Sequence, residues 1–320
     1  MIQFNRFDFR ATWQSDALMP AYWGSALRGG LGKWLRQTSC ILRTRGCDGC
    51  AVRASCAYGF IFETENIQSD RERGNINARP HPIVVELPFP CDFSTNKGMS
   101  FDFSILLMDR ANEFFHHVLF SIVKLGQEDG IGARARQGYG RFQVDSVRCG
   151  EEVVYDRKSA EIKKPSAVRK LNLQEMSTER KNEDAMGRDK LEVGFETPFR
   201  AKYKGRFSRK VPFHLLIRTA LRRISSLETA YGQGEPDLDY SGLIKAAEEV
   251  KTVREELQWA EVPRFSSRQK SKMMIGGPVG TVTYQGEDVC RFLPFLKYCE
   301  DVHLGKQTFF GLGKIRVIPE

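Results

Sequence analysis

Residues 132–144 read GARARQGYGRFQV, and residues 305–317 read GKQTFFGLGKIRV. The two stretches align without a gap, and a basic residue followed by a strand pattern ends each of them. The matched glycines are Gly132 with Gly305, Gly138 with Gly311, and Gly140 with Gly313. Glycine is needed where the backbone takes a positive φ or comes close to another part of the chain. Three glycines at the same spacing therefore predict an internal duplication of one folding unit.

Hydrophobic periodicity around these stretches predicts what that unit is. In the first half, it predicts strands at 2–10, 83–87, 100–108 and 141–147, with helices at 22–37 and 111–125. In the second half, it predicts strands at 191–201, 265–275, 280–284 and 314–318, with helices at 213–231, 241–257 and 289–300. The basic order βαββαβ is that of the ferredoxin-like, or RRM-like, unit. We therefore expect an α+β chain of two tandem ferredoxin-like domains, at 1–150 and 191–320, joined by a charged connector at 151–190.

Length and composition agree with two globular domains. The chain has 320 residues, of which 41% are hydrophobic and 28% charged, which excludes a disordered or fibrous protein. No apolar run approaches the roughly 18 residues that cross a bilayer, and charged residues interrupt the N-terminal segment where a signal peptide is apolar. The sequence thus predicts a cytoplasmic protein without a membrane partner. The formal net charge of +9 favours a polyanionic partner.

Four of the eight cysteines are clustered. Cys40, Cys47, Cys50 and Cys56 lie within 17 residues, with six, two and five residues between successive members. Cytoplasmic thiols stay reduced, and four thiolates at such spacing can close a tetrahedron around zinc. The cluster predicts a structural zinc site in an insertion at about 38–60. An iron–sulfur cluster and unmetallated thiols are the alternatives.

Basic residues are concentrated in the second half. No acidic residue occurs between Thr197 and Leu227, whereas nine lysines and arginines do. Such a run is either a solvated face or a surface that contacts phosphate, and the interleaved Phe199, Tyr203 and Phe207 could stack on unpaired bases. The glycine-rich stretches are either tight turns or loops that hold phosphate. The residues predicted to contact RNA are Arg28, Lys33, Arg134, Arg136, Arg141, Arg206, Arg209, Lys210, Arg218, Arg222, Arg268, Lys270, Lys272, Gly311, Gly313 and Lys314.

Several motifs together carry a family resemblance. They are YWGSALRGGLGKWLR from Tyr22, CAYGFIFE from Cys56, KSKMMIGGPVGTVTYQG from Lys270, and HLGKQTFFGLGKIRV from His303. In this order they resemble the CRISPR-associated endoribonucleases of the RAMP superfamily, which process precursor CRISPR RNA. The resemblance implies two ferredoxin-like domains that bind a CRISPR repeat RNA and cut it once per repeat, as part of antiviral defence. It also implies a reaction without a catalytic metal, in which the ribose 2'-hydroxyl attacks the adjacent phosphorus.

That chemistry requires a base, an acid and a cation near the phosphorane. Histidine suits proton transfer near neutral pH. His303 and Lys306 stand at the mouth of the second glycine-rich stretch and are the first candidates, with Tyr22 as a partner. His81 and His214 are alternatives. The pair His116 and His117 falls within a predicted apolar helix, a position more typical of a structural histidine.

Two other functions remain open from the sequence. One is a non-catalytic RAMP subunit that holds guide RNA in a CRISPR effector complex, whose proteins would then be partners of this chain. The other is a zinc-containing regulator that binds DNA or proteins through its cysteine insertion. A single-turnover cleavage assay distinguishes the enzyme from the first, and the choice of RNA over duplex DNA distinguishes it from the second.

Overall fold

The computed structural model describes residues 1–42, 46–64, 79–91, 95–176, 189–266 and 271–319, with the backbone alone at 265 and 266. The chain divides into two compact units. The N-terminal unit is Gln3–Lys170, and the C-terminal unit is Leu171–Glu320 together with Met1–Ile2. None of the helices in the described ranges has the length and apolar character that crossing a membrane requires.

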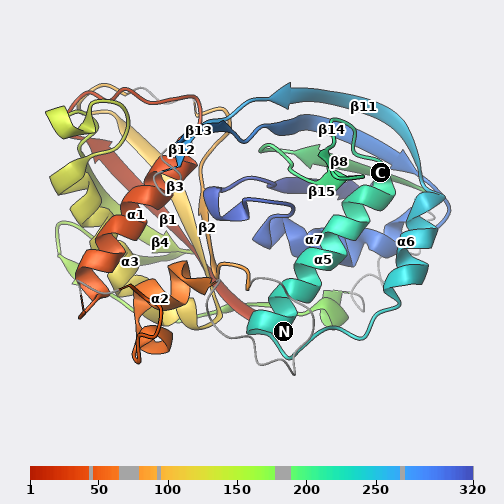
Figure 1. Cartoon of the computed structure of the whole chain (residues 1–320), viewed down its shortest axis with the longest axis horizontal. Helices are drawn as coiled ribbons and strands as arrows, with labels where there is room; N and C mark the ends of the chain where they lie inside the picture. The colour runs from red at the N-terminus through yellow and green to blue at the C-terminus, as the bar shows by residue number, and fades with distance from the viewer. Residues whose placement is uncertain (43–45, 65–78, 92–94, 177–188, 267–270, 320) are drawn as a thin grey trace. The chain divides into compact units, whose positions relative to one another are not determined.

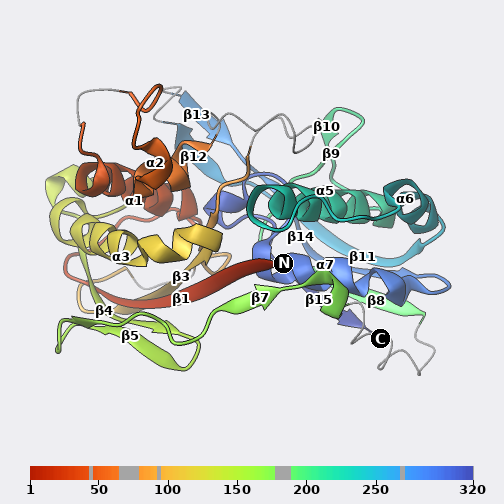
Figure 2. The same ribbon diagram turned by 90° about the horizontal axis from the view of Figure 1, so that it is seen from below.

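The N-terminal unit contains the predicted βαββαβ order. Its sheet runs β2-β3-β1-β4, with antiparallel pairing between neighbours. The elements are β1 (Ile2–Trp13), α1 (Gly24–Ser39), β2 (Ile83–Glu86), β3 (Ser100–Met108), α3 (Phe115–Lys124) and β4 (Phe142–Cys149), with the short α2 (Ala57–Phe62) after α1. Figure 2 shows α1 and α3 on one face of this sheet.

The sequence pattern explains the packing of this unit. Along β1, buried residues alternate with more exposed ones, as a sheet covered on one face requires. The ring of Phe7 stacks on Phe115 of α3 with centroids 4.0 Å apart. In α1, the buried Leu27, Leu31 and Leu35 recur every four residues and form the stripe that faces the sheet.

Part of the predicted connector belongs to the first sheet instead. Residues 152–156 form β5 (Glu152–Asp156), which pairs with β4, and β6 (Glu161–Ile162) pairs with β5. The buried Val154 is the apolar anchor of this extension among charged neighbours. The short β7 (Arg169–Leu171) pairs with β1. The rest of the predicted connector includes 177–188, which lies outside the described residues.

The C-terminal unit repeats the same topology. Its sheet runs β11-β14-β8-β15, the order of the first sheet with each strand replaced by its counterpart. The elements are β8 (Lys190–Phe195), α5 (Phe213–Tyr231), α6 (Tyr240–Glu248), β11 (Lys251–Ala260), β14 (Gly277–Gln285), α7 (Leu293–Val302) and β15 (Ile315–Pro319). Two small hairpins are β9 (Lys202–Tyr203) with β10 (Arg206–Phe207), and β12 (Pro263–Ser266) with β13 (Ser271–Met274). Figure 1 shows α5 and α7 on one face of this sheet, and the tandem ferredoxin-like prediction is confirmed.

Two element predictions in this unit are wrong. The helix expected at 241–257 ends at Glu248, and residues 251–257 lie in β11. Residues 251–256 are exposed in an edge strand, so their side chains show no apolar period, and backbone pairing with β14 decides the conformation. The strand expected at 265–275 is divided between β12 and β13, with 267–270 outside the described residues.

The two glycine-rich stretches have the same backbone. We call residues 130–141 the first glycine loop and residues 303–314 the second glycine loop. Their matched glycines all take positive φ, a region that side chains disfavour. The φ values are 98° and 92° at Gly132 and Gly305, 88° and 84° at Gly138 and Gly311, and 66° and 76° at Gly140 and Gly313.

Close backbone approach explains the last glycine of each loop. The N–H of Ile131 donates to the carbonyl of Gly140 at 2.9 Å, and the N–H of Leu304 donates to that of Gly313 at 2.9 Å. A Cβ atom at Gly140 would lie 1.8 Å from the carbonyl oxygen of Ile131, and one at Gly313 would lie 1.8 Å from that of Leu304. Both loops therefore close through the same contact, which only glycine permits.

Candidate nucleic-acid interface

Arg200, in the loop between β8 and β9, connects three parts of the C-terminal unit. Its carbonyl accepts the N–H of Lys306 in the second glycine loop at 2.8 Å. Its guanidinium donates to the carbonyl of Gly276, just before β14, and lies 4.0 Å from the ring centroid of Phe207 in β10. Arg200 itself is buried, and burial lowers the pKa of its guanidinium. It is thus a positioning residue that fixes the aromatic ring beside the loop.

Further cations lie over aromatic rings in the same unit. The guanidinium of Arg209 is 5.0 Å from the ring of Trp259 in β11, and that of Arg264 is 4.4 Å from the ring of Phe310 in the second glycine loop. Phe207 remains 37% exposed, so its ring is accessible to a ligand. Exposed rings beside fixed positive charges suit the bases and phosphates of single-stranded nucleic acid.

The predicted basic run is largely solvent-facing. Of its members, Arg200 and Arg223 are buried, whereas the residues exposed to solvent are Lys202, Lys204, Arg206, Arg209, Lys210, Arg218 and Arg222. Lys272 in β13 is also exposed, and the predicted contacts Arg268 and Lys270 lie outside the described residues. These exposed lysines and arginines give the C-terminal unit positive charge that is accessible to a polyanion.

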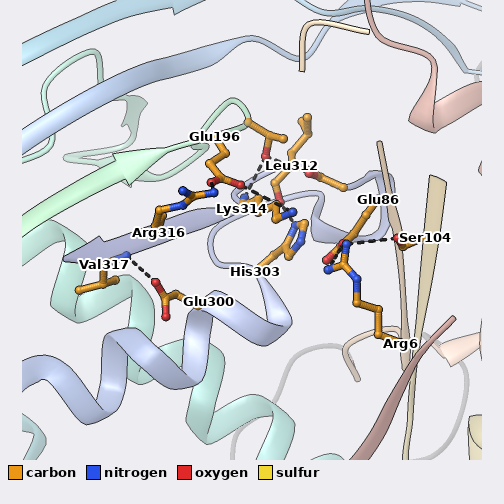
Figure 3. Close-up of polar contacts among 12 residues, drawn as sticks. Arg6, Glu86, Ser104, Glu196, Glu300, His303, Leu312, Lys314, Arg316 and Val317 are labelled. Carbon is orange, nitrogen blue, oxygen red and sulfur yellow. Dashed lines mark hydrogen bonds and ion pairs between the residues drawn. The ribbon is translucent and has the colours of Figure 1, made fainter. Parts of the chain in front are cut away.

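The second glycine loop is held by side chains from the turn that follows β8. The hydroxyl of Thr197 donates to the carbonyl of Gly311 at 2.9 Å and accepts the N–H of Lys314 at 2.8 Å. The ammonium of Lys314 lies 3.6 Å from Glu196, which also pairs with Arg316 at 2.8 Å (Figure 3). Gly311 and Gly313 are buried, which favours the tight-turn interpretation over direct phosphate contact. Lys306, by contrast, is exposed.

His303 is fully buried and lies in a strained backbone conformation. Its φ of 58° and ψ of 159° fall in a region that is populated almost entirely by glycine, and the residue at the same place in the first loop is Gly130, with φ 73° and ψ −178°. Its Nδ1 lies 3.2 Å from the carbonyl of Leu312 (Figure 3). The buried Arg223 donates from Nε to the carbonyl of His303 at 3.2 Å.

As placed, the imidazole of His303 has no exposed surface with which to contact RNA. The expected catalytic role therefore gains no support from this geometry. The contacts instead suit a positioning residue that fixes the start of the second glycine loop.

Tyr22 is likewise inaccessible in the N-terminal unit. It is 1% exposed, and its ring lies edge-on to Phe89 with centroids 5.6 Å apart. Burial raises the pKa of its hydroxyl well above the ordinary value, with smaller contributions from Cys91 and Glu86. Its structural role in the core is clear, while the predicted partnership in catalysis gains no support from this placement.

The other predicted contacts in the N-terminal unit differ in accessibility. The guanidinium of Arg28 lies 4.6 Å from the ring of Phe62, and Lys33 pairs with Asp129 at 2.5 Å. The remaining three, Arg134, Arg136 and Arg141, are exposed in the first glycine loop. Of the alternative histidines, His81 has its Nδ1 2.9 Å from the carbonyl of Ile61, and His214 is half-buried in α5.

The cysteine cluster does not form a metal site as placed. Among the described residues, no three His, Cys, Asp or Glu side chains come together in a way that could hold a metal ion. Burial raises the pKa of the Cys47 thiol, with smaller upward contributions from Glu63, Cys40 and Cys56 and a downward one from Arg36. Cys40 and Cys56 thus lie near Cys47 without forming a ligand set. Structural zinc at this cluster stays a prediction.

Sequence reasoning missed Trp259. The stretch 251–260 was assigned mostly to a helix, so Trp259 fell beyond the end of the predicted element. A Cβ atom at Gly276 would lie 2.9 Å from Nε1 of Trp259, which places this indole at the turn that Arg200 holds. The β-branched Thr252 and Val253 were a signal that could have identified the strand.

Comparisons with known proteins assign both units. Residues 2–167 match the family model AF_1859_N, an N-terminal domain, and residues 193–315 match the model of the CRISPR-associated endoribonuclease Cas6. No curated protein matches the chain.

Solved structures are similar over the whole chain at low sequence identity. A partial Cas6-RT-Cas1–Cas2 complex is 11% identical with a TM-score of 0.59, and the alignment covers 100% of this chain and 46% of that one. This chain therefore spans about half the length of that relative. Thermus thermophilus Cas6 is 12% identical with a TM-score of 0.54, covering 99% of each chain. A Cas6 product complex is 16% identical with a TM-score of 0.51, covering 99% of this chain and 100% of that one. At these identities, the likeness establishes the fold.

Proposed function

We propose that this Cas6-type chain, which belongs to the AF_1859_N family over residues 2–167 and matches the Cas6 model over residues 193–315, binds CRISPR repeat RNA and cleaves precursor CRISPR RNA into guide RNAs. The observation that carries the proposal is the surface centred on Arg200. There an exposed ring, Phe207, stacks with a guanidinium next to the second glycine loop.

The chemistry of that surface suits RNA with unpaired bases. Phe207 offers an exposed π face, and the surrounding lysines and arginines offer charge for phosphates. The half-buried imidazole of His214, at the start of α5, has its ring centroid 5.5 Å from that of Tyr203 in β9. Burial lowers its pKa, so the imidazole is mainly neutral at pH 7 and able to accept a hydrogen bond.

The proposed reaction uses no catalytic metal. The ribose 2'-hydroxyl next to the cut attacks the phosphorus, the bond to the 5'-oxygen breaks, and a cyclic phosphate and a 5'-hydroxyl result. Proton transfer by side chains and a positive charge near the phosphorane are sufficient for this chemistry. The substrate supplies its own nucleophile, so RNA is required and DNA is inert.

A single-turnover assay tests this function. Purified full-length chain, in excess EDTA, should cleave a repeat RNA from the same genome and leave unchanged a repeat with a 2'-deoxyribose at the cut. Loss of cleavage in EDTA that added metal restores would refute the metal-free reaction. Cleavage of the deoxy substrate would refute attack by the 2'-hydroxyl.

A second function is favoured by the burial of His303 and Tyr22. With two predicted catalytic side chains enclosed, the chain could instead be a subunit that holds guide RNA without cutting it. The same assay separates the two, because such a subunit would bind repeat RNA tightly and release no product at any enzyme excess.

Other CRISPR proteins are proposed as partners. The similar relative in the Cas6-RT-Cas1–Cas2 complex supports this class of partner. Co-purification of this chain with Cas proteins encoded beside it, in the presence and absence of ribonuclease, would test whether the association is direct. We also propose that the chain acts in the cytoplasm, where the repeat transcript is made.

A further inference from the structure

A pocket in the N-terminal unit is lined by two histidines that are adjacent in sequence. It has a volume of about 440 Å³ and is lined by Gln37, Thr38, His116, His117 and Phe120. The first two come from the last turn of α1, and the other three from α3. We propose that His116 and His117 are the proton-transfer pair of the RNA cleavage reaction, an inference that rests on the function proposed above.

Helix packing positions the pocket. The hydroxyls of Thr38 and Ser121 lie 3.3 Å apart, which fixes the end of α1 against α3. The hydroxyl of Ser121 also donates to the carbonyl of His117 at 2.6 Å. The pocket wall therefore belongs to two helices that are bound to each other, and a substrate would meet side chains already in place.

Neighbouring rings support both imidazoles. The ring of His117 lies edge-on to Phe114 with centroids 6.0 Å apart, and that of His116 lies 5.9 Å from Phe115. Phe114 and Phe115 are buried, whereas His116 and His117 are exposed. A buried aromatic layer under two accessible imidazoles orients them without removing them from solvent.

The rest of the pocket suits one nucleotide. Phe120 is 50% exposed and offers a surface on which a base can stack. Gln37 and Thr38 add amide and hydroxyl groups that can hydrogen-bond a base edge or a ribose. The ammonium of Lys124 lies 5.9 Å from the centroid of the Phe120 ring and pairs with Glu128 at 3.2 Å.

Accessibility distinguishes this pair from His303 and Tyr22. His303 and Tyr22 have 0% and 1% of their surface exposed. Nδ1 of His81 lies close to the Ile61 carbonyl, 2.9 Å away. His116 and His117 are adjacent, exposed and next to a cavity, and two imidazoles can supply both the base and the acid that the reaction needs.

The proton balance of the step closes with these two side chains. One neutral imidazole takes the proton of the 2'-hydroxyl while its oxygen forms a bond to phosphorus. The bond from phosphorus to the 5'-oxygen breaks, and the second imidazole, in its protonated form, gives a proton to that oxygen. The products are the cyclic phosphate and the 5'-hydroxyl, and the two histidines exchange protons with solvent before the next turnover.

The test compares histidine variants of the full chain in single-turnover cleavage. Each of His116→Ala and His117→Ala should lower the cleavage rate by about 10²- to 10⁴-fold, with the affinity for an uncleavable 2'-deoxy repeat unchanged. Added imidazole should restore part of the rate, which a structural role would not allow. Phe120→Ala should instead weaken RNA binding by about 10-fold through lost stacking. Glu113→Gln, on an exposed side chain before α3 that does not line the pocket, is the matched control and should cleave like the parent.

The outcomes separate the inference from the function on which it rests. If the parent cleaves and the double variant His116→Ala/His117→Ala cleaves equally well, the pocket is not the catalytic site although the chain is an endoribonuclease. If the double variant is inactive but imidazole restores nothing and RNA affinity is lost as well, the pair is structural and the inference also fails. If the parent binds repeat RNA without cutting it, the proposed enzyme function fails, and this inference with it.

Discussion

His303 allows the backbone strain in the second glycine loop to be measured. The change is His303→Gly compared with His303→Ala. Both variants lose the same buried ring and its contact with Leu312, but the alanine keeps a side chain at φ 58° and ψ 159° and the glycine does not. The difference between them therefore isolates the strain of that conformation.

The expected magnitude follows from two opposing effects. Holding a non-glycine residue in this region costs about 1–3 kcal/mol. Glycine loses more conformational freedom on folding than alanine, which costs it about 0.5–1 kcal/mol. His303→Gly should therefore be the more stable variant, by about 1 kcal/mol. At an ordinary helical position, the order is reversed.

The matched control is Cys299, a buried residue of α7 four positions earlier. There Cys299→Ala should be more stable than Cys299→Gly by about 1 kcal/mol. Urea unfolding of the full chain, followed by hydrogen exchange in peptides of the C-terminal unit, measures each variant. If alanine is the more stable substitution at both positions, His303 is not strained and its role as a positioning residue loses its basis.

Three further predictions concern other parts of the chain. Gly140→Ala should destabilise the N-terminal unit by about 2–5 kcal/mol, from positive φ and overlap with a carbonyl; Gly138→Ala, with nothing within 4 Å of its Cβ, should cost only about 1–2 kcal/mol in the same urea assay. Equal losses would contradict the steric argument. Arg134→Ala/Arg136→Ala should make the dependence of log affinity for single-stranded RNA on log salt shallower by about 1.4, and an unchanged slope in binding titrations would exclude phosphate contact at the first glycine loop. Burial lowers the pKa of His214, so the folded chain binds a proton at this imidazole less readily than the unfolded chain does. Protonation therefore favours the unfolded chain, and the free energy of unfolding should decrease as the pH falls below about 6.5. His214→Asn should flatten that part of the stability profile measured by urea unfolding, and an identical profile would refute the assignment.

The sequence predicts the topology well where one face of an element is buried. The leucines of α1 and the alternation in β1 reveal their elements because packing against one sheet face imposes a period. The sequence predicts a helix where β11 begins, because residues 251–256 are exposed and have no apolar period. Backbone pairing with β14 makes them a strand. Glycine spacing predicted the two loops, since a positive φ or a close approach leaves no other residue suitable.

The candidate site was harder to predict than the fold. In the sequence, His303 stands at the mouth of a loop, whereas in the structure its carbonyl accepts a hydrogen bond from Arg223, a residue 80 positions away in sequence. The basic run contacts aromatic rings that lie far away in sequence: Arg209, for example, lies over Trp259. No local sequence pattern contains such contacts. His116 and His117 are predicted to be structural because they fall in an apolar helix. Periodicity shows that such a helix has a buried face, but it does not show that the end of α1 leaves a pocket beside α3.

The matching backbones of the two glycine loops make their outer residues exchangeable. Each loop has the same closing contact between its last glycine and the residue before its first matched glycine, yet Arg134 and Arg136 are exposed in one copy, and Phe309 and Phe310 are buried in the other. The residues between the matched glycines therefore differ in the two loops, while the backbone conformation stays the same. The same turn can therefore carry a solvent-facing surface in one unit and a buried aromatic pair in the other.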